Sequence, residues 1–327
     1  MKNYMVAKKL GRILLAVTIA AVFGGLPAFA ADYPTRPVEM IVSYAPGGGQ
    51  DTSIRVLARF AEKYLGQRIV VVNMHGGGNM AGNIHILKAK PDGYTIGTWV
   101  NGLVTDEFIF KGAPYTYKSF EPLCHVVADP HVLTIRKSLG INDMKTFMQY
   151  VKDNPGKVTF GAGGNWTTHD FFRLKMEMAE NLNWRRMPYL GGAPALRDVA
   201  ADACDATTPL VPEILPMLDS GKVVALAVAS EKRVPILADI PTCKEAGYDI
   251  VQSIWRGLTV PKGTPKEISD KLESVFKQTL EDPEAIDAML KAGVNPVWMD
   301  HVEFTKFMEQ EHAFYAKALK EWGVEPR

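Results

Sequence analysis

The stretch VEMIVSYAPGGGQD, residues 38–51, joins an apolar run to three glycines and an acidic residue. The apolar run from Val38 to Tyr44 predicts a buried strand. A helix is expected from Asp51 to Leu65, because apolar residues recur at helical spacing up to the stop at Gly66. Glycines between a strand and a helix let backbone N–H groups face a ligand. The stretch therefore predicts an α/β unit with a binding loop at the carboxyl end of a strand.

The same pattern recurs along the chain. Strands are expected at Ile69–Val72 and Tyr94–Val100, with a helix over residues 79–89 between them. Apolar strands that alternate with helices indicate a parallel sheet covered on both faces. A second α/β series begins with a helix at Asp143. Its expected strands are Val158–Phe160, Met187–Tyr189, Ala203–Thr207 and Val223–Ala229.

Two extended passages, Leu123–Ile135 and Val251–Val260, connect the two α/β units, and no flexible linker separates them. After Pro265 the chain is expected to be helical apart from a short extended segment near Val294–Trp298. The predicted fold class is α/β: a two-lobed periplasmic binding protein (flytrap) with two parallel-sheet-containing domains joined by two crossing strands. We expect one lobe from residues 31–130 and 256–327, and the other from residues 131–255. The ligand would bind in the cleft between them.

The first thirty residues have the three parts of a secretory signal peptide. Basic residues at the start precede an uncharged apolar run, Ile13–Leu26, which ends at Ala28-Phe29-Ala30. A membrane anchor is the alternative, but the run is shorter than the ~20 apolar residues that a span needs. We therefore expect cleavage near Ala30–Ala31 and a periplasmic mature protein.

The charge balance and the motifs exclude several functions. Lysine and arginine number 37 against 36 acidic residues, so the chain lacks the basic field that nucleic acid requires. Cys124, Cys204 and Cys243 have no metal-ligand spacing and are expected to be small buried hydrophobic residues, although one disulfide would be possible. Neither a G-x-S-x-G nor an H-E-x-x-H motif occurs. We expect no catalytic residue, no metal and no cofactor.

A dinucleotide-binding loop is the competing interpretation of the glycines in residues 47–49. That motif needs a third glycine where this chain has Thr52, and an acidic residue where the second strand ends in Asn73. An α/β enzyme therefore remains only a minor alternative.

Several segments, in order and spacing, resemble the Bug-type (TctC-like) substrate-binding proteins of tripartite tricarboxylate transporters. The resemblance covers nearly the whole mature chain. It implies a periplasmic binding protein that delivers an organic acid to membrane permease subunits; a ligand sensor with the same two lobes is an alternative. The expected form is a monomer. Segments that carry the resemblance include Tyr33-Pro34-Thr35-Arg36-Pro37, Pro46-Gly47-Gly48-Gly49, Leu65-Gly66-Gln67, Pro91-Asp92-Gly93-Tyr94-Thr95, Gly191-Gly192-Ala193-Pro194-Ala195-Leu196, Glu245-Ala246-Gly247-Tyr248 and Pro261-Lys262-Gly263-Thr264-Pro265.

The resemblance also implies the binding residues, which lie mainly in the loops that follow strands. In the family, backbone and hydroxyl groups hold the ligand carboxylates. Asp51 is expected to begin a helix and to lie on the cleft wall. The candidate ligand-binding residues are Tyr44, Gly48, Gly49, Gln50, Asp51, Asn101, Gly163, Gly164, Asn165, Thr167, Thr168, Tyr189, Thr208, Pro209 and Arg256.

This chain departs from the family at several of these positions. Pro209 and Leu210 stand where an Asp-Asn pair is common, which removes hydrogen-bonding capacity from the second lobe. We therefore expect a carboxylate with a more apolar or bulkier body than citrate. Arg256 stands where an aromatic residue is common. It is either a fork-shaped partner for a carboxylate or a surface arginine on a connecting strand.

Overall fold

The computed structural model describes residues 33–44, 46–47, 49–162, 167–189 and 192–324. The chain separates into residues 1–35 and residues 36–327, and the architecture below is that of the second part. The expected signal peptide lies outside the described residues. Among the helices that are described, none has both the length and the apolar character needed to cross a membrane.

The first sheet has six strands in the order β11-β4-β10-β3-β1-β2. Strands β1, β2 and β3 are parallel, as expected, whereas the crossing strand β10 runs antiparallel to β3 and β4, so the sheet as a whole is mixed. The reason is that β10 returns from the other sheet and enters in the opposite direction. The strands are β1 (Val38–Val42), β2 (Ile69–Asn73), β3 (Thr95–Val100), β4 (Phe120–Pro130), β10 (Ser253–Pro261) and β11 (Pro296–Met299).

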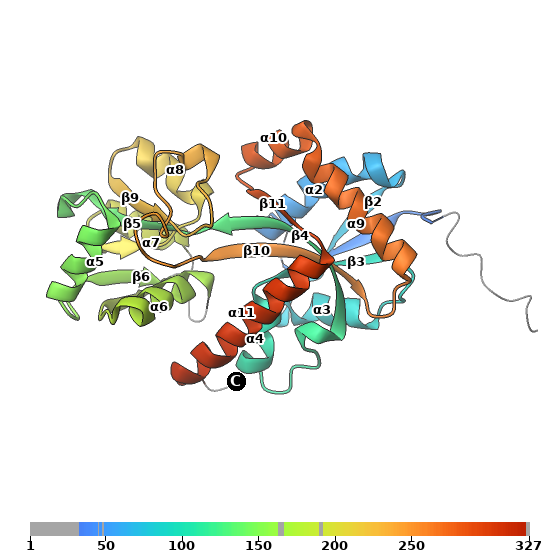
Figure 1. The fold of residues 1–327 in the computed structure, drawn as a ribbon, viewed down its shortest axis with the longest axis horizontal. Helices are drawn as coiled ribbons and strands as arrows, with labels where there is room; N and C mark the ends of the chain where they lie inside the picture. The colour runs from blue at the N-terminus through green and yellow to red at the C-terminus, as the bar shows by residue number, and fades with distance from the viewer. Residues whose placement is uncertain (1–32, 45, 48, 163–166, 190–191, 325–327) are drawn as a thin grey trace, which may run out of the picture. The chain divides into compact units, whose positions relative to one another are not determined.

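Six helices surround this sheet. Those on one face, α3, α4 and α11, share a core cluster with the sheet in which Ile86, Leu103 and Phe304 pack against Ile41 and Trp99. Helices α2, α9 and α10 contact one another on the other side (Figure 1). The bounds are α2 (Gly49–Leu65), α3 (Met80–Lys88), α4 (Gly102–Ile109), α9 (Lys266–Glu281), α10 (Pro283–Lys291) and α11 (His301–Glu321).

The second sheet has five strands in the order β7-β6-β8-β5-β9. Here β6 pairs in parallel with β7 and β8, while β5 is antiparallel to β8 and β9. The strands are β5 (Val132–Arg136), β6 (Thr159–Ala162), β7 (Arg185–Pro188), β8 (Ala206–Thr207) and β9 (Val223–Val228). The helices are α5 (Met144–Asp153), α6 (Thr168–Glu180), α7 (Gly192–Ala200) and α8 (Val211–Asp219).

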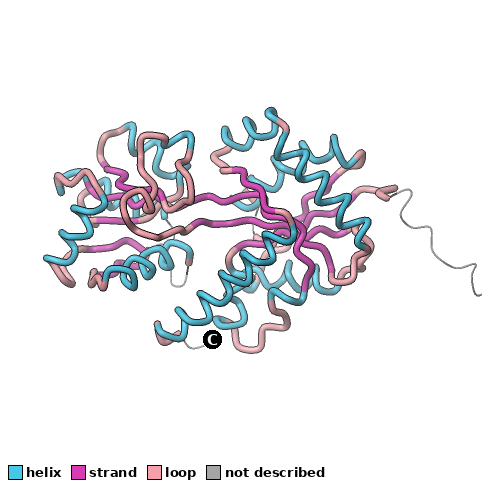
Figure 2. Tube along the Cα trace, viewed as in Figure 1, coloured by secondary structure: helices cyan, strands magenta, loops and turns pink. Residues whose placement is uncertain are grey.

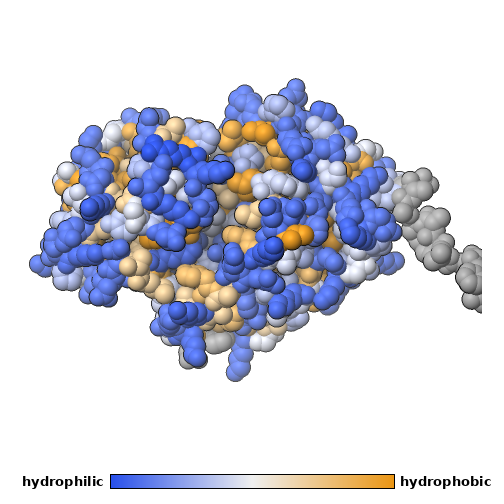
Figure 3. Space-filling view, in the orientation of Figure 1, coloured by the Kyte–Doolittle hydropathy of each residue, from blue (hydrophilic) through white to orange (hydrophobic). Residues whose placement is uncertain are grey.

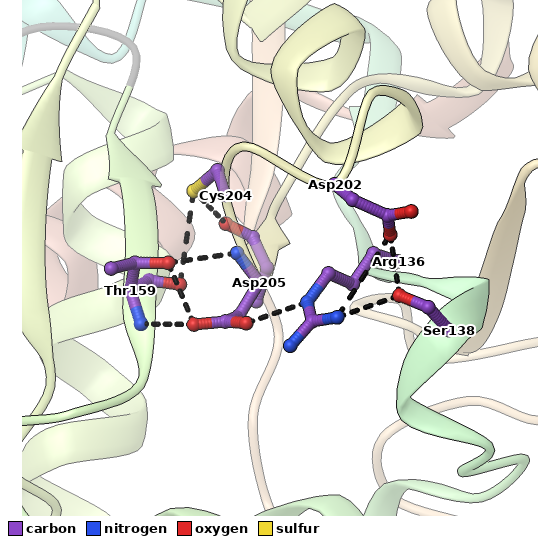
Figure 4. A network of polar contacts seen from close by, with 7 residues as sticks. Arg136, Ser138, Thr159, Asp202, Cys204 and Asp205 are labelled. Atoms are coloured by element: carbon purple, nitrogen blue, oxygen red, sulfur yellow. Dashed lines mark hydrogen bonds and ion pairs between the residues drawn. The ribbon is translucent and has the colours of Figure 1, made fainter.

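Strand β8 is shorter than the expected Ala203–Thr207 because Asp205 uses its side chain in a polar network. Its carboxylate accepts the backbone N–H and the hydroxyl of Thr159, both at 2.7 Å, and Arg136 Nε at 2.7 Å. Figure 4 shows Asp205 between these two residues, with Ser138 on the far side of the arginine. Burial raises the pKa of Asp205, but the hydrogen bonds from Thr159 and Arg136 outweigh it and lower the pKa.

Two strands join the sheets, as the sequence predicted. Strand β4 continues through His131 directly into β5, and β10 runs back beside β4 (Figures 1 and 2). The backbone N–H of His131 donates to the Gln252 carbonyl at 3.0 Å, which holds the two crossings together. The α/β fold with two sheets and two crossing strands is therefore confirmed. The lobe borders at 130/131 and 255/256 stay a proposal.

The core is formed by apolar residues of both sheets and their helices. Cys124, Cys204 and Cys243 are free and buried, which confirms them as small core residues. The large hydrophobic side chains that remain exposed, among them Val70 and Ile236, are far apart in the sequence. Hydrophilic residues cover much of the face shown in Figure 3, with smaller hydrophobic areas between them.

Candidate functional site

A cavity of about 650 Å³ lies at the carboxyl ends of β1 and β3. This volume is in the range of small-molecule binding sites. Elements of both sheets supply its wall, which is where a flytrap binds its ligand. The lining residues are Tyr44, Pro46, Gly47, Gly49, Gln50, Val100, Asn101, Gly102, Thr105, Thr167, Thr168, Phe171, Leu210, Ile254 and Arg256.

The predicted site residues fall into three groups. Those in the cavity wall are Tyr44, Gly49, Gln50, Asn101, Thr167, Thr168 and Arg256. Those described but absent from the wall are Asp51, Tyr189, Thr208 and Pro209. Those outside the described residues are Gly48, Gly163, Gly164 and Asn165.

The Asp51 carboxylate stabilises the loop between β1 and α2 through hydrogen bonds. Its carboxylate accepts the Gly47 N–H at 2.8 Å, Arg55 Nε at 2.9 Å and Asn73 Nδ2 at 2.8 Å. Burial raises the pKa of Asp51, but the hydrogen bonds from Arg55, Gly47 and Asn73 lower it by more than burial raises it, so the carboxylate stays ionised. It is a residue of the helix start, as expected, but it is buried and is not in the cavity wall.

Gln50 lies at the start of α2 with its amide fixed by Thr98. Its Nε2 donates to the Thr98 carbonyl at 3.2 Å and to the Thr98 hydroxyl oxygen at 2.9 Å, and that hydroxyl donates to the Ile41 carbonyl at 2.7 Å. The side chain therefore ties the binding loop to β1 and β3. A threonine, which is common here in the family that the sequence resembles, is too short to span this distance.

Asn101 lies between the end of β3 at Val100 and the start of helix α4 at Gly102, directly after the third strand as expected. Its Nδ2 donates to the Ser253 carbonyl at 3.1 Å, and its Oδ1 accepts the Trp255 N–H at 3.1 Å. Both polar ends of the side chain are thus used to dock β10 beside the cavity. The apolar residues Val104 and Phe108, at i, i+4 spacing, were the available signal for the missed helix.

Arg256 is buried, with only 3% of its side chain exposed, so its interpretation as a surface arginine is wrong. It forms an ion pair with Asp129 on the neighbouring strand β4, whose other oxygen accepts the Asn295 N–H at 2.9 Å. Its Nη2 lies 3.0 Å from the position that a Cβ atom on Gly49 would occupy. A side chain at position 49 would therefore press against the guanidinium, which lies close to the start of α2.

The remaining second-sheet candidates make structural contacts instead. The Tyr189 hydroxyl donates to Asp198 at 2.7 Å, and the Pro209 carbonyl accepts the Val132 N–H at 2.9 Å. The Thr208 carbonyl lies 2.9 Å from Nδ1 of His131 and 2.7 Å from Nδ1 of His169. Burial lowers the pKa of both histidines, so both rings are neutral and donate from Nδ1.

The list of site residues missed the apolar wall residues, two glycines and the hydroxyl residue Thr105. Phe171 lies one helical turn after Thr168 on α6, so the i, i+3 spacing was the signal that could have found it. Leu210 was noted only as a departure from the family, and Ile254 precedes the predicted Arg256 by two residues on the same strand. Within the described parts of the chain, no cluster of three His, Cys, Asp or Glu side chains could hold a metal ion.

Residues 53–324 match the model of the tripartite tricarboxylate transporter family receptor, TctC. The chain is 30% identical to the protein BugT of Bordetella pertussis over 324 residues, covering 96% of this chain and 98% of BugT. A TctC solute-binding protein from Polaromonas, solved without ligand, has a TM-score of 0.81 at 30% identity, covering 89% of this chain and all of that one. R. palustris Rpa4515, solved with adipate, has a TM-score of 0.72 at 27% identity, covering 90% and 100%.

Proposed function

This chain belongs to the tripartite tricarboxylate transporter receptor family, and on that premise we propose that it captures a small organic carboxylate in the cavity between its two sheets and delivers it to membrane permease subunits. The observation that carries the proposal is the composition of the cavity wall. It combines a buried arginine and a helix start from one sheet with apolar side chains from the other.

The first sheet supplies the attraction for an anion. Helix α2 begins at Gly49 in the cavity wall, so its unpaired N–H groups and the positive end of its dipole favour a carboxylate there. Arg256 is the charged residue among the wall residues that are described. Its partner Asp129 uses one edge of the guanidinium and leaves Nη2 on the side of Gly49. A ligand carboxylate beside Gly49 would then be shared by the helix start and the arginine.

The second sheet supplies an apolar surface for the body of the acid. Phe171 and Leu210 line the cavity together with Ile254 of the crossing strand. A citrate body would place polar groups against these side chains without hydrogen-bond partners, which costs free energy. We propose an acid whose body is more apolar or bulkier than citrate, with Thr167 and Thr168 as hydroxyl contacts.

Capture is proposed to close the two lobes about the crossing strands β4 and β10. A ligand drives closure only by binding the closed form more tightly than the open one. The closed form would then dock on the permease subunits. A sensor that presents the closed form to a signalling partner uses the same geometry and is the second candidate.

A thermal-shift screen of the mature chain from about Ala31, the start that the signal peptide predicts, tests the proposal. The panel contains aliphatic di- and tricarboxylates, aromatic acids and amino acids, and the protein is unfolded and refolded first to empty the cavity. A binder of the folded state raises the melting temperature. We expect a shift with aromatic or long aliphatic acids that exceeds the shift with citrate. No shift with any carboxylate would overturn capture, and a preference for citrate would overturn the apolar body.

The variant Leu210→Asn tests the proposal that the bound acid has an apolar body. It places a polar amide where the family commonly has one, without changing the size of the side chain greatly. The preferred acid should lose affinity by roughly fivefold, because an unmatched polar group then faces its apolar body. An unchanged ranking of the acids would show that Leu210 does not select the ligand.

A further inference from the structure

A polar network lies directly behind the first binding loop and reaches the cavity at Tyr44. The Asn79 amide is at its centre: its Nδ2 donates to the Tyr44 hydroxyl oxygen at 3.4 Å, and its Oδ1 lies 3.3 Å from the Tyr115 hydroxyl oxygen. The Tyr115 hydroxyl lies 2.7 Å from Asp106 Oδ2 and accepts Asn83 Nδ2 at 3.0 Å. Apart from Tyr44, these side chains are buried.

The backbone of Asn79 indicates that its position is specified and not incidental. Its φ of 94° is in the left-handed region, which asparagine tolerates better than most residues but at a cost in free energy. Gly102 leaves the room for it, because a Cβ atom at Gly102 would lie 2.6 Å from Asn79 Nδ2 and 3.7 Å from the Tyr44 hydroxyl. Tyr44 and Gly102 both line the cavity.

The direction of these hydrogen bonds decides what Tyr44 offers to a ligand. A tyrosine hydroxyl has one hydrogen to donate and can also accept. Because Asn79 donates to the Tyr44 oxygen, the hydrogen of that hydroxyl stays available to a partner in the cavity. A carboxylate accepts such a hydrogen, whereas an ammonium group cannot.

Asp106 lies at the back of the network without a cation. Within the described residues no lysine or arginine forms an ion pair with it, and its Oδ1 lies 3.5 Å from where a Gly102 Cβ atom would be. The titratable groups around it are Tyr115 and Tyr44; its neighbour Glu107 on α4 pairs instead with His312 of α11. Burial raises the pKa of Asp106 to about 7, although the hydrogen bonds from Tyr115 and Asn79 lower it.

We infer that Asn79, held in place by Tyr115 and Asp106, is a positioning residue that makes the Tyr44 hydroxyl a donor to the ligand carboxylate, and that binding is coupled to a proton on Asp106. This inference rests on the proposed capture of a carboxylate. The ionised Asp106 repels an anion on the other side of Gly102, so binding favours its protonated form. Affinity therefore rises as the pH falls.

Binding of benzoate, adipate and malate by calorimetry tests the positioning role. Tyr44→Phe should weaken the strongest of these by about tenfold, because it removes a hydrogen bond to a charged group. Asn79→Gly removes the amide while keeping a residue that suits the positive φ, and it should weaken binding by roughly fivefold. Tyr64→Phe, whose hydroxyl bonds Asp282 and which is absent from the cavity wall, is the matched control and should leave affinity unchanged.

The double variant distinguishes positioning from general damage. If Asn79 acts through Tyr44, then Asn79→Gly adds no loss in the Tyr44→Phe background. If the double variant loses affinity by the product of the two single losses, the inference is wrong. It is also wrong if Asn79→Gly binds with the affinity of the wild type. Should Asn79→Gly fail to fold, Tyr115→Phe takes its place, with the same cycle and a smaller expected loss.

The pH profile tests Asp106. Wild-type affinity should increase by roughly fivefold from about pH 8.5 to pH 6.5, where the carboxyls of the three acids are ionised throughout. Asp106→Asn should flatten this profile. A flat wild-type profile, or an unchanged slope in Asp106→Asn, would overturn the proton coupling. Failure of all three acids to bind the wild type would instead overturn the proposed capture itself.

Discussion

Two carboxylates shielded from solvent, Asp205 in the second sheet and Asp106 behind the cavity, have opposite surroundings. The Asp205 carboxylate accepts hydrogen bonds from an arginine side chain and from a backbone N–H, and its pKa is lowered. Asp106 accepts hydrogen bonds from Tyr115 and Asn79, has no ion pair with a lysine or arginine in the described part of the chain, and has its pKa raised to about 7. Burial raises the pKa of both, so the difference comes from the donors around each group. A carboxylate with charged and backbone donors stabilises the fold, whereas one without them is poised to change its charge.

The largest effect is expected from Asp205→Ala. The change leaves Arg136 without its nearest carboxylate and the Thr159 N–H without its acceptor. We expect a loss of about 3 kcal/mol in the free energy of unfolding, measured in urea. A loss below about 1 kcal/mol would mean that water replaces the network and that Asp205 does not hold β6 and β8 together.

Asp106→Asn should have the opposite sign. At pH 8 the native protein must keep a buried negative charge at this site, whereas asparagine is neutral. A pKa of about 7 against the ordinary 3.8 corresponds to a destabilisation of several kcal/mol, of which we expect Asp106→Asn to recover about 2. A destabilised variant at pH 8 would contradict this account and show that the two carboxylates act alike.

The pH dependence of wild-type stability sharpens the same contrast. The native pKa of Asp106 is above its unfolded value, so the native state binds a proton first and stability rises as the pH falls from about 7 to about 4. Asp205 has a lowered native pKa, so its contribution is present above the unfolded pKa of about 4 and is lost below it. Urea unfolding from about pH 8 to about pH 3 should lack the first slope in Asp106→Asn and the second slope in Asp205→Ala.

The smallest effect is expected from Ser138→Ala at the exposed edge of the Asp205 network (Figure 4). The Ser138 hydroxyl accepts Arg136 Nη1 at 2.6 Å and donates to Asp202, but both bonds are exposed. Water can replace them, so we expect a change in stability within about 0.5 kcal/mol. A loss as large as that of Asp205→Ala would place the centre of the network at the serine.

Local patterns predicted most of the secondary structure because they depend on neighbours in the chain. The apolar run before Gly47 gave β1, and helical spacing gave α2 and α5 close to their observed bounds. An error arose where a side chain acts over a distance. Strand β8 is short because Asp205 bonds Thr159, 46 residues away.

The family and the glycine-containing loop between β1 and α2 were determined by the sequence alone, because short segments in fixed order specify a fold and an apolar run followed by glycines marks a loop after a strand. Which charged and polar groups at the candidate site are paired was decided only by the tertiary structure. Arg256 meets Asp129 across 127 residues, and the network behind Tyr44 brings together Asn79, Asp106 and Tyr115 from separate segments. Whether a buried group is paired depends on those long-range contacts, and spacing along a chain contains no information about them.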